Sequence, residues 1–120
     1  MSFDPKNFIG IAKELSKGST EAHYRSIINR AYYSAFGHIK NNLPGLYSQG
    51  SSVHQDLIKC LKNSPLVNEK KAGYKLETLF KKRKEADYDY KNEIKQGACN
   101  YTISEAEAII KLFDDKETIE

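Results

Sequence analysis

The sequence predicts an all-α protein, an antiparallel bundle of four to five helices. Apolar residues recur every three or four positions along most of the chain, which is the spacing of helices that bury one face. No window shows the alternation of apolar and polar residues that indicates a strand. The chain has 120 residues, 39% of them hydrophobic and 29% charged. This length and composition fit a single domain, residues 1–120, with one core.

The first two helices are predicted by their start signals. Asp4 can cap free N–H groups and Pro5 fits a first helical turn, so a helix is expected from there to about Lys17. A serine and a threonine at 19–20 can each cap a second helix, which is expected to end near residues 43–45. Its apolar stripe consists of Tyr24, Ile27, Ile28, Ala31, Ala35 and Ile39.

Three further helices are predicted after a loop at residues 43–52, which are rich in Pro, Gly and Ser. Residues 52–55 have the spacing of a capping box in front of a third helix. A fourth helix is expected to reach about residues 90–91. Residues 102–105 form a second capping box and predict the start of a fifth helix, and the tail at about 114–120 is expected to fray.

Positive charge is concentrated in one part of the chain, although the formal net charge is only +3. Between Glu69 and Lys84, seven basic residues stand against two acidic ones. Such a segment can face a phosphate chain or can form an ordinary solvated helix surface. The seven basic residues are Lys70, Lys71, Lys75, Lys81, Lys82, Arg83 and Lys84.

Several classes of protein are disfavoured by missing motifs. No stretch approaches the roughly 18 consecutive apolar residues of a membrane span, so a cytoplasmic protein without membrane association is expected. Cys60 and Cys99 lack CxxC spacing, and His23, His38 and His54 do not form a metal-ligand set. No phosphate-binding glycine loop, nucleophile elbow or HExxH motif is present. We therefore expect no metal and no cofactor.

Three segments together resemble the HEPN family of small helical domains. They are YRSIINRAYYSAFGHIK at residues 24–40, SSVHQDL at residues 51–57 and LETLFKKRKEADYDY at residues 76–90. The most specific part is Arg-Ala-Tyr-Tyr at residues 30–33 combined with Arg-x-x-Ala-Asp-Tyr at residues 83–88. The resemblance implies an antiparallel bundle that forms a homodimer with a cleft between the subunits. Many HEPN proteins are metal-independent endoribonucleases of toxin–antitoxin or antiviral defence systems.

The resemblance also implies roles for individual residues. The catalytic motif of the family is an arginine and a histidine with four to six residues between them. Arg83 matches the arginine, whereas Tyr88 stands where the histidine is expected. Tyr90 falls at the position of a tyrosine that, in related toxins, is adenylylated by a nucleotidyltransferase antitoxin. A tyrosine with a pKa near 10 is a poor general base, which makes Tyr88 an acid or a positioning group.

Two functions follow as hypotheses. In the first, RNA binds in a basic cleft and is cleaved by attack of the 2′-hydroxyl, which leaves a cyclic phosphate. Arg83 would stabilise the charge on the phosphorane with Tyr88 beside it, and Lys81, Lys82 and Lys84 would contact phosphates. In the second, a non-catalytic dimer binds a nucleotide or docks a nucleotidyltransferase or another defence component.

Helical geometry gives alternatives for several of these residues. Arg83, Asp87 and Tyr90 should share a helix face, whereas Arg83 and Tyr88 would be about 140° apart. Arg83 could therefore simply pair with Asp87, and Tyr90 could lie in the core or at an interface. Arg30 and Tyr33 are predicted to lie away from the apolar stripe of the second helix, where they could contact RNA or pack in a dimer seam.

Two histidines allow alternatives of the same kind. His38 follows the Arg-Ala-Tyr-Tyr segment, so it is either a replacement proton carrier or a polar surface residue. His54 lies in the first turn of the third predicted helix, where a cap or an interhelix hydrogen bond is expected.

Overall fold

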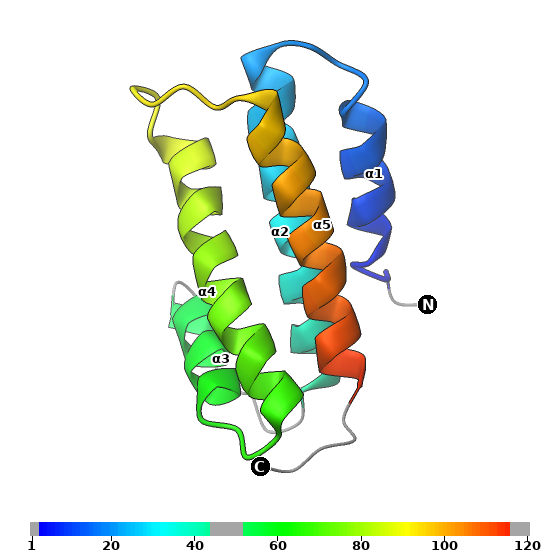
Figure 1. Cartoon of the computed structure of the whole chain (residues 1–120), viewed down its shortest axis with the longest axis vertical. Helices are drawn as coiled ribbons and strands as arrows, with labels where there is room; N and C mark the ends of the chain where they lie inside the picture. The colour runs from blue at the N-terminus through cyan, green and yellow to red at the C-terminus, as the bar shows by residue number, and fades with distance from the viewer. Residues whose placement is uncertain (1–2, 44–51, 116–120) are drawn as a thin grey trace.

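A computed structural model of the chain contains, in the part that it describes, five helices packed in a bundle (Figure 1). The structure describes residues 3–43 and 52–115, and no β-strand is present in these two ranges. The all-α prediction is confirmed. The helices are α1 (Asn7–Leu15), α2 (Glu21–Asn42), α3 (Val53–Lys62), α4 (Val67–Tyr88) and α5 (Gln96–Asp114).

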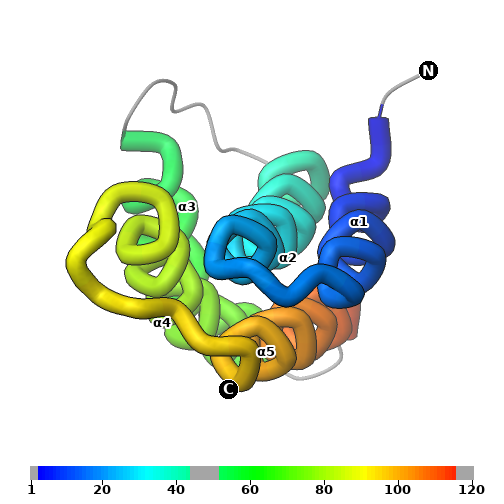
Figure 2. The backbone as a smooth tube through the Cα atoms, turned by 90° about the horizontal axis from the view of Figure 1, so that it is seen from above, coloured from blue at the N-terminus to red at the C-terminus, as the bar shows by residue number. Residues whose placement is uncertain are grey.

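Helix α2 lies at the centre of the bundle. It contacts α1, α4 and α5, while α3 packs on α4 at the side away from α1 (Figure 2). Ala31, Tyr32 and Ala35 of α2 are completely buried, and Phe36 is nearly so. The predicted apolar stripe covers only part of this buried surface, because a helix surrounded by neighbours buries more than one face.

The start signal of the second helix is confirmed, whereas that of the first helix is met only in part, because its N-cap residue is Lys6. Oδ1 of Asp4 accepts a hydrogen bond from the N–H of Lys6 at 3.0 Å, one residue before α1 begins. The hydroxyl of Thr20 accepts from the N–H of His23 at 3.3 Å and so caps α2. The side chain of Ser52 caps no N–H of α3 among the described residues, so the first predicted capping box is not formed there.

The predicted start of the fifth helix is wrong. Helix α5 begins at Gln96, and Thr102 lies inside it, completely buried. The Thr102 hydroxyl donates to the carbonyl oxygen of Ala98 at 2.7 Å, so the helix itself satisfies this polar group.

The predicted ends of α4 and α5 are also corrected. Helix α4 ends at Tyr88, since Asp89 leaves the helical region with φ −96° and ψ 86°. Helix α5 extends to Asp114, so the expected fraying does not start there. Residues 116–120 of the expected tail and residues 44–51 of the predicted loop lie outside the described part of the chain.

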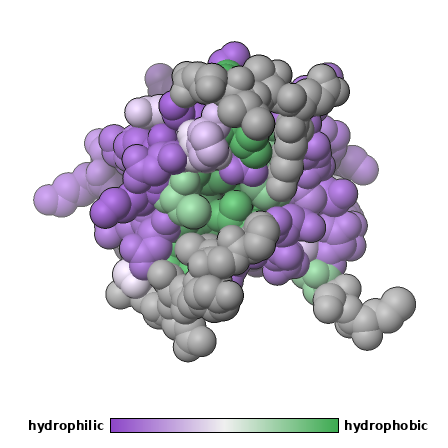
Figure 3. All heavy atoms as spheres, turned by 90° about the horizontal axis from the view of Figure 1, so that it is seen from below, coloured by the Kyte–Doolittle hydropathy of each residue, from purple (hydrophilic) through white to green (hydrophobic). Residues whose placement is uncertain are grey.

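The surface of the bundle is mainly polar. Seen from below, hydrophilic residues surround a hydrophobic area at the centre of this end (Figure 3). None of the helices in the described ranges is long and apolar enough to cross a membrane.

Candidate nucleic-acid interface

The four basic residues 81–84 point in different directions from α4, because successive residues on a helix are about 100° apart. Lys81 and Lys84 line a groove on the side of α3. Lys82 lies on the side of α5, where its Nζ is 5.4 Å from the centre of the Tyr101 ring. Arg83 points into the bundle and is only 7% exposed.

Arg83 is held by the ion pair that its spacing predicts. Its Nη1 donates to Oδ2 of Asp87 at 3.2 Å, one turn further along α4. Asp87 also accepts from Nδ2 of Asn29, on α2, at 3.1 Å. The predicted pairing of Arg83 with Asp87 is therefore confirmed, and Asn29 completes it from the neighbouring helix.

The guanidinium of Arg83 lies among aromatic rings. Its central carbon is 5.6, 5.5 and 5.3 Å from the ring centres of Tyr32, Tyr33 and Phe80. Burial opposes the charge of Arg83, but the hydrogen bond to Asp87 and the nearby tyrosines outweigh it and raise the pKa. Nε of Arg83 is buried and has no hydrogen-bond partner among the described residues.

The position predicted for Tyr33 is wrong. Tyr33 does not face away from the apolar part of α2 but is half-buried against the core. Its ring lies edge-on to those of Tyr32 and Phe36, with centres 5.3 and 6.0 Å apart. The reason is the central position of α2, which brings α3 and α4 against this second face.

His54 completes the surroundings of Arg83 from α3. Its ring stacks on Phe36, with centres 4.1 Å apart, and on Phe80, with centres 5.2 Å apart. Nδ1 of His54 is 2.8 Å from the hydroxyl of Tyr32, which confirms the predicted interhelix hydrogen bond.

Protonation states follow from this environment. Burial raises the pKa of Tyr32, so its hydroxyl keeps the proton and donates to Nδ1 of His54. Burial, with smaller effects of Arg83 and Lys40, lowers the pKa of His54 to about 4. His54 is thus a neutral imidazole beside a charged guanidinium at pH 7.

We refer to these residues as the arginine cluster, which consists of Arg83, Asp87, Asn29, Tyr32, Tyr33 and His54. Its members come from α2, α3 and α4. The sequence contains a partial signal for it, since Arg83 and His54 are both polar residues within the apolar pattern of their helices.

Tyr88 and Tyr90 lie outside the arginine cluster. Tyr88 is the last residue of α4 and is 70% exposed. Tyr90 is 77% exposed, and its ring centre is 5.6 Å from the guanidinium of Arg25. The predicted common face of Arg83, Asp87 and Tyr90 is wrong because the helix ends before Tyr90, and Tyr90 is not a core residue.

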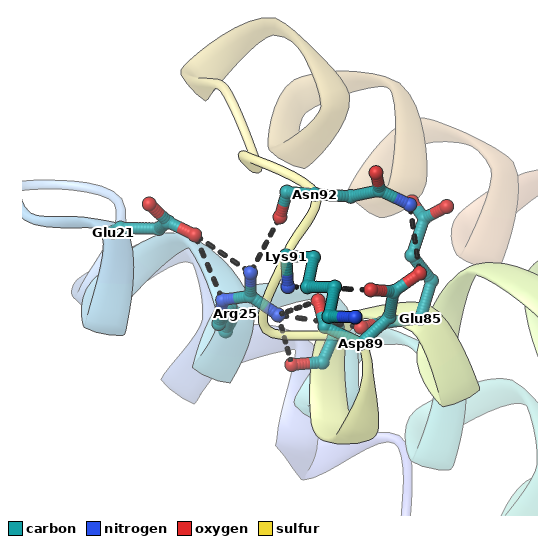
Figure 4. Close-up of polar contacts among 7 residues, drawn as sticks. Glu21, Arg25, Glu85, Asp89, Lys91 and Asn92 are labelled. Atoms are coloured by element: carbon teal, nitrogen blue, oxygen red, sulfur yellow. Dashed lines mark hydrogen bonds and ion pairs between the residues drawn. The ribbon is translucent and has the colours of Figure 1, made fainter.

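Arg25 of α2 fixes the segment in which Tyr90 lies (Figure 4). Its Nη1 donates to the carbonyl oxygens of Ala86 and Asp89 at 2.9 and 3.1 Å. Its Nη2 donates to the carbonyl oxygen of Asn92 at 2.6 Å and to Oε2 of Glu21 at 2.7 Å. A cation at this place satisfies the carbonyl groups that the end of a helix leaves free. The sequence analysis did not identify this role of Arg25.

Arg30 lies at the edge of the arginine cluster, where its Nη1 donates to Oδ1 of Asn29 at 3.3 Å and it lines a hollow with Asn29 and Asp87. It is exposed, and its guanidinium lies 5.7 Å from the ring centre of Phe8, in the first helix. Tyr33, the other member of this predicted pair, contacts Arg83 instead. The two side chains therefore do not form one RNA contact within a single subunit.

His38 is not a polar surface residue, which was one of the two roles considered for it from the sequence. It is buried, and its Nε2 lies 2.7 Å from Oδ1 of Asp114 at the end of α5. Its ring also packs edge-on against Phe113. His38 therefore joins α2 to α5 and takes no part in the arginine cluster.

A second feature, which we call the lysine groove, lies between α3 and α4. Its volume is about 440 Å³, and it gathers four lysines and one carboxylate. Glu77, the carboxylate, pairs with Nζ of Lys62 at 3.0 Å. The residues that line the groove are Gln55, Ile58, Lys59, Lys62, Asn63, Glu77, Phe80, Lys81 and Lys84. The sequence analysis identified Lys81 and Lys84 but missed Lys59 and Lys62, which form the opposite wall.

A larger hollow, of about 730 Å³, lies between α1 and α5 but has mixed charge. Lys6 and Lys111 face Glu107, Asp114 and Asp115 there. Because the charges of both signs are interspersed, this hollow lacks the positive potential that attracts a phosphate chain. The lysine groove is the better candidate for an anionic polymer.

No group of three or more His, Cys, Asp or Glu residues in the described ranges is arranged to hold a metal ion. No protein-family model matches the chain, and no curated protein or solved structure is significantly similar to it. The interpretation of the site therefore depends on its own geometry.

Proposed function

We propose that this protein is a HEPN-like RNA-binding protein that holds the phosphate backbone of RNA in the lysine groove. The observation that supports it is the gathering of four lysines and one carboxylate between two packed helices. Lysines that contact phosphates release counterions, which gives strong, sequence-independent and salt-sensitive binding.

The arginine cluster has a supporting part in this proposal. Arg83 is buried and paired with Asp87, so within one subunit it supports α4 from the inside, while Lys81 and Lys84 face the ligand. Homodimer formation, a nucleotidyltransferase partner and adenylylation of Tyr90 stay predictions from the resemblance. The high exposure of Tyr90 is compatible with its modification.

A salt titration of RNA binding tests the proposal. A fluorescently labelled RNA is titrated with the wild type and with a Lys81→Ala/Lys84→Ala double variant, and anisotropy is followed at several salt concentrations. We expect the slope of log K against log salt to fall by about two in magnitude, since each lost phosphate contact removes about one. The matched control is Lys17→Ala/Lys95→Ala, which removes two exposed lysines outside the groove.

The control should keep the wild-type slope. The proposal is refuted if the wild type shows no salt-dependent binding, or if both double variants weaken binding equally.

A second candidate function is metal-independent cleavage of the bound RNA. The observation that favours it is the pair of donors in the arginine cluster: Nδ1 of the neutral His54 accepts from Tyr32, so its Nε2–H can donate, and with the charged guanidinium of Arg83 it can stabilise a phosphorane. Tyr88, the group predicted for this role, is exposed at the end of α4 and would have to act in the cleft of a partner subunit.

Incubation with a pool of cellular RNA in the presence of a chelator tests this second function. Fragments ending in a cyclic phosphate are expected from the wild type and not from His54→Gln or Arg83→Met, each first checked for folding by circular dichroism. A Tyr88→Phe variant distinguishes the two arrangements, because it loses activity only if Tyr88 takes part. If the wild type gives no such fragments, cleavage is excluded and binding remains as the function.

A further inference from the structure

Tyr74 lies beside Lys62, one of the four lysines that line the lysine groove. It is on α4, one turn before Glu77, and is 54% exposed. Nζ of Lys62, which lines the groove, is 4.9 Å from the centre of the Tyr74 ring. An open aromatic ring therefore adjoins the lysines that are proposed to hold phosphates.

The interior of the groove also offers more than positive charge. Gln55 and Asn63 contribute amide groups, which both donate and accept hydrogen bonds. Phe80 contributes an aromatic ring, with Nζ of Lys84 4.6 Å from its centre. These groups can contact bases, and bases are accessible in a single strand but hidden within a duplex.

The width of the groove points to the same class of ligand. Its two walls are the directly packed helices α3 and α4. The axes of packed helices are about 8–10 Å apart, so a duplex does not fit between them and could touch the groove only from outside. A single strand can lie along such a groove.

We infer that the ligand of the lysine groove is single-stranded RNA, and that one base stacks on the ring of Tyr74 while the lysines hold the adjoining phosphates. This inference rests on the proposed RNA-binding function and adds the class of RNA and a base-stacking residue. Positively charged grooves combined with aromatic side chains are the usual means of binding single strands without reading their sequence.

The chain offers a matched control at Tyr101. This residue of α5 is 47% exposed, and Nζ of Lys82 lies 5.4 Å from its ring centre. Tyr101 thus has the same kind of ring and the same kind of cation as Tyr74, but its lysine, Lys82, does not line the lysine groove, whereas Lys62 beside Tyr74 does. Substitution of Tyr74 should therefore remove the RNA affinity that base stacking contributes, whereas substitution of Tyr101 should not.

The test compares three competitors of equal phosphate number on the full chain. They are an unstructured single-stranded RNA, an RNA duplex and inorganic polyphosphate, each displacing a labelled single-stranded RNA. We expect Tyr74→Leu to weaken single-stranded RNA about tenfold and to leave polyphosphate unchanged, because stacking requires an aromatic ring and a base. Tyr74→Phe should retain the wild-type affinity, and Tyr101→Leu should behave as the wild type.

The outcomes separate this inference from the proposed function. If Tyr74→Leu binds single-stranded RNA as tightly as the wild type, or if the duplex competes equally well, the inference is overturned while salt-dependent binding still supports the groove. If no competitor binds in a salt-dependent manner, the proposed function fails and the inference fails with it. Both tyrosines are exposed, so circular dichroism of each variant should match that of the wild type.

Discussion

Arg83 and Lys84 are neighbours in the sequence, yet they belong to regions with opposite properties. Arg83 lies in the arginine cluster, where Asp87 and aromatic rings surround it. Lys84 lies in the lysine groove, with its ammonium group over the ring of Phe80. A single helix thus directs one charge into the protein and the next toward solvent.

The difference shows how position decides the use of a charge. A buried cation must have fixed partners, because an uncompensated charge in the interior costs several kcal/mol. An exposed lysine is hydrated and screened, and its ion pairs contribute little to stability. We therefore expect substitutions in the arginine cluster to affect folding and substitutions in the lysine groove to affect binding.

The largest effect is expected from Asp87→Ala. This change leaves the buried guanidinium of Arg83 without its carboxylate, and we expect it to lower the free energy of unfolding by about 3 kcal/mol. Urea unfolding followed by circular dichroism measures the change. The control is Arg83→Met/Asp87→Asn, which removes both charges, keeps an acceptor for Asn29 and should recover most of the loss. If Asp87→Ala lowers the free energy of unfolding by less than about 0.5 kcal/mol, the substitution does not leave a buried Arg83 without its counter-charge.

A smaller loss is expected from Arg25→Ala, at the other inward-pointing arginine. The substitution removes the hydrogen bonds to Glu21 and to the carbonyl groups after α4, and about 2 kcal/mol of stability should be lost. Arg30→Ala is the control, since Arg30 is exposed and its loss should cost less than about 0.5 kcal/mol. Equal effects of the two substitutions in the same urea titration would show that Arg25 does not hold this segment.

The sequence predicted contacts between residues that lie within one helical turn of each other. The pairing of Arg83 with Asp87 follows from a spacing of four residues on one helix, and Thr20 was one of the two residues predicted to cap α2. Asn29 reaches Asp87 from α2 and His54 lies near Arg83 from α3, and their positions depend on how the helices pack. No spacing along the chain contains that information.

The same limit applies to the lysine groove and to α5. The wall formed by Lys59 and Lys62 becomes visible only when α3 is placed beside α4. The start of α5 was misjudged because Thr102 has the features of a cap residue, whereas the structure buries it and satisfies its hydroxyl within the helix. Burial of a polar residue inside a helix is decided by packing.

The pH dependence of stability should distinguish the arginine cluster from the groove. The pKa of His54 is about 4 in the folded protein, below its ordinary value of 6.5, so folding favours the neutral imidazole. Its contribution to stability is complete above about pH 6.5 and is lost as the pH falls toward about 4. In urea titrations at several pH values, the difference between the wild type and His54→Gln should therefore shrink as the pH is lowered across this range. A difference that stays constant would show that the pKa of His54 is not depressed.

The smallest effect on stability is expected from Lys84→Ala. Lys84 directly follows Arg83, whose ion pair with Asp87 is the basis of the largest expected effect. Its ammonium group is exposed and makes one cation–π contact, so the free energy of unfolding should change by less than about 0.5 kcal/mol. RNA binding should nevertheless weaken, and the slope of log K against log salt should fall by about one in magnitude, because one phosphate contact is lost. Substitution of Lys17, an exposed lysine outside the groove, should change neither quantity. If Lys84→Ala instead destabilised the protein as strongly as Asp87→Ala does, the division between an inward cluster that supports the fold and an outward groove that binds RNA would not hold.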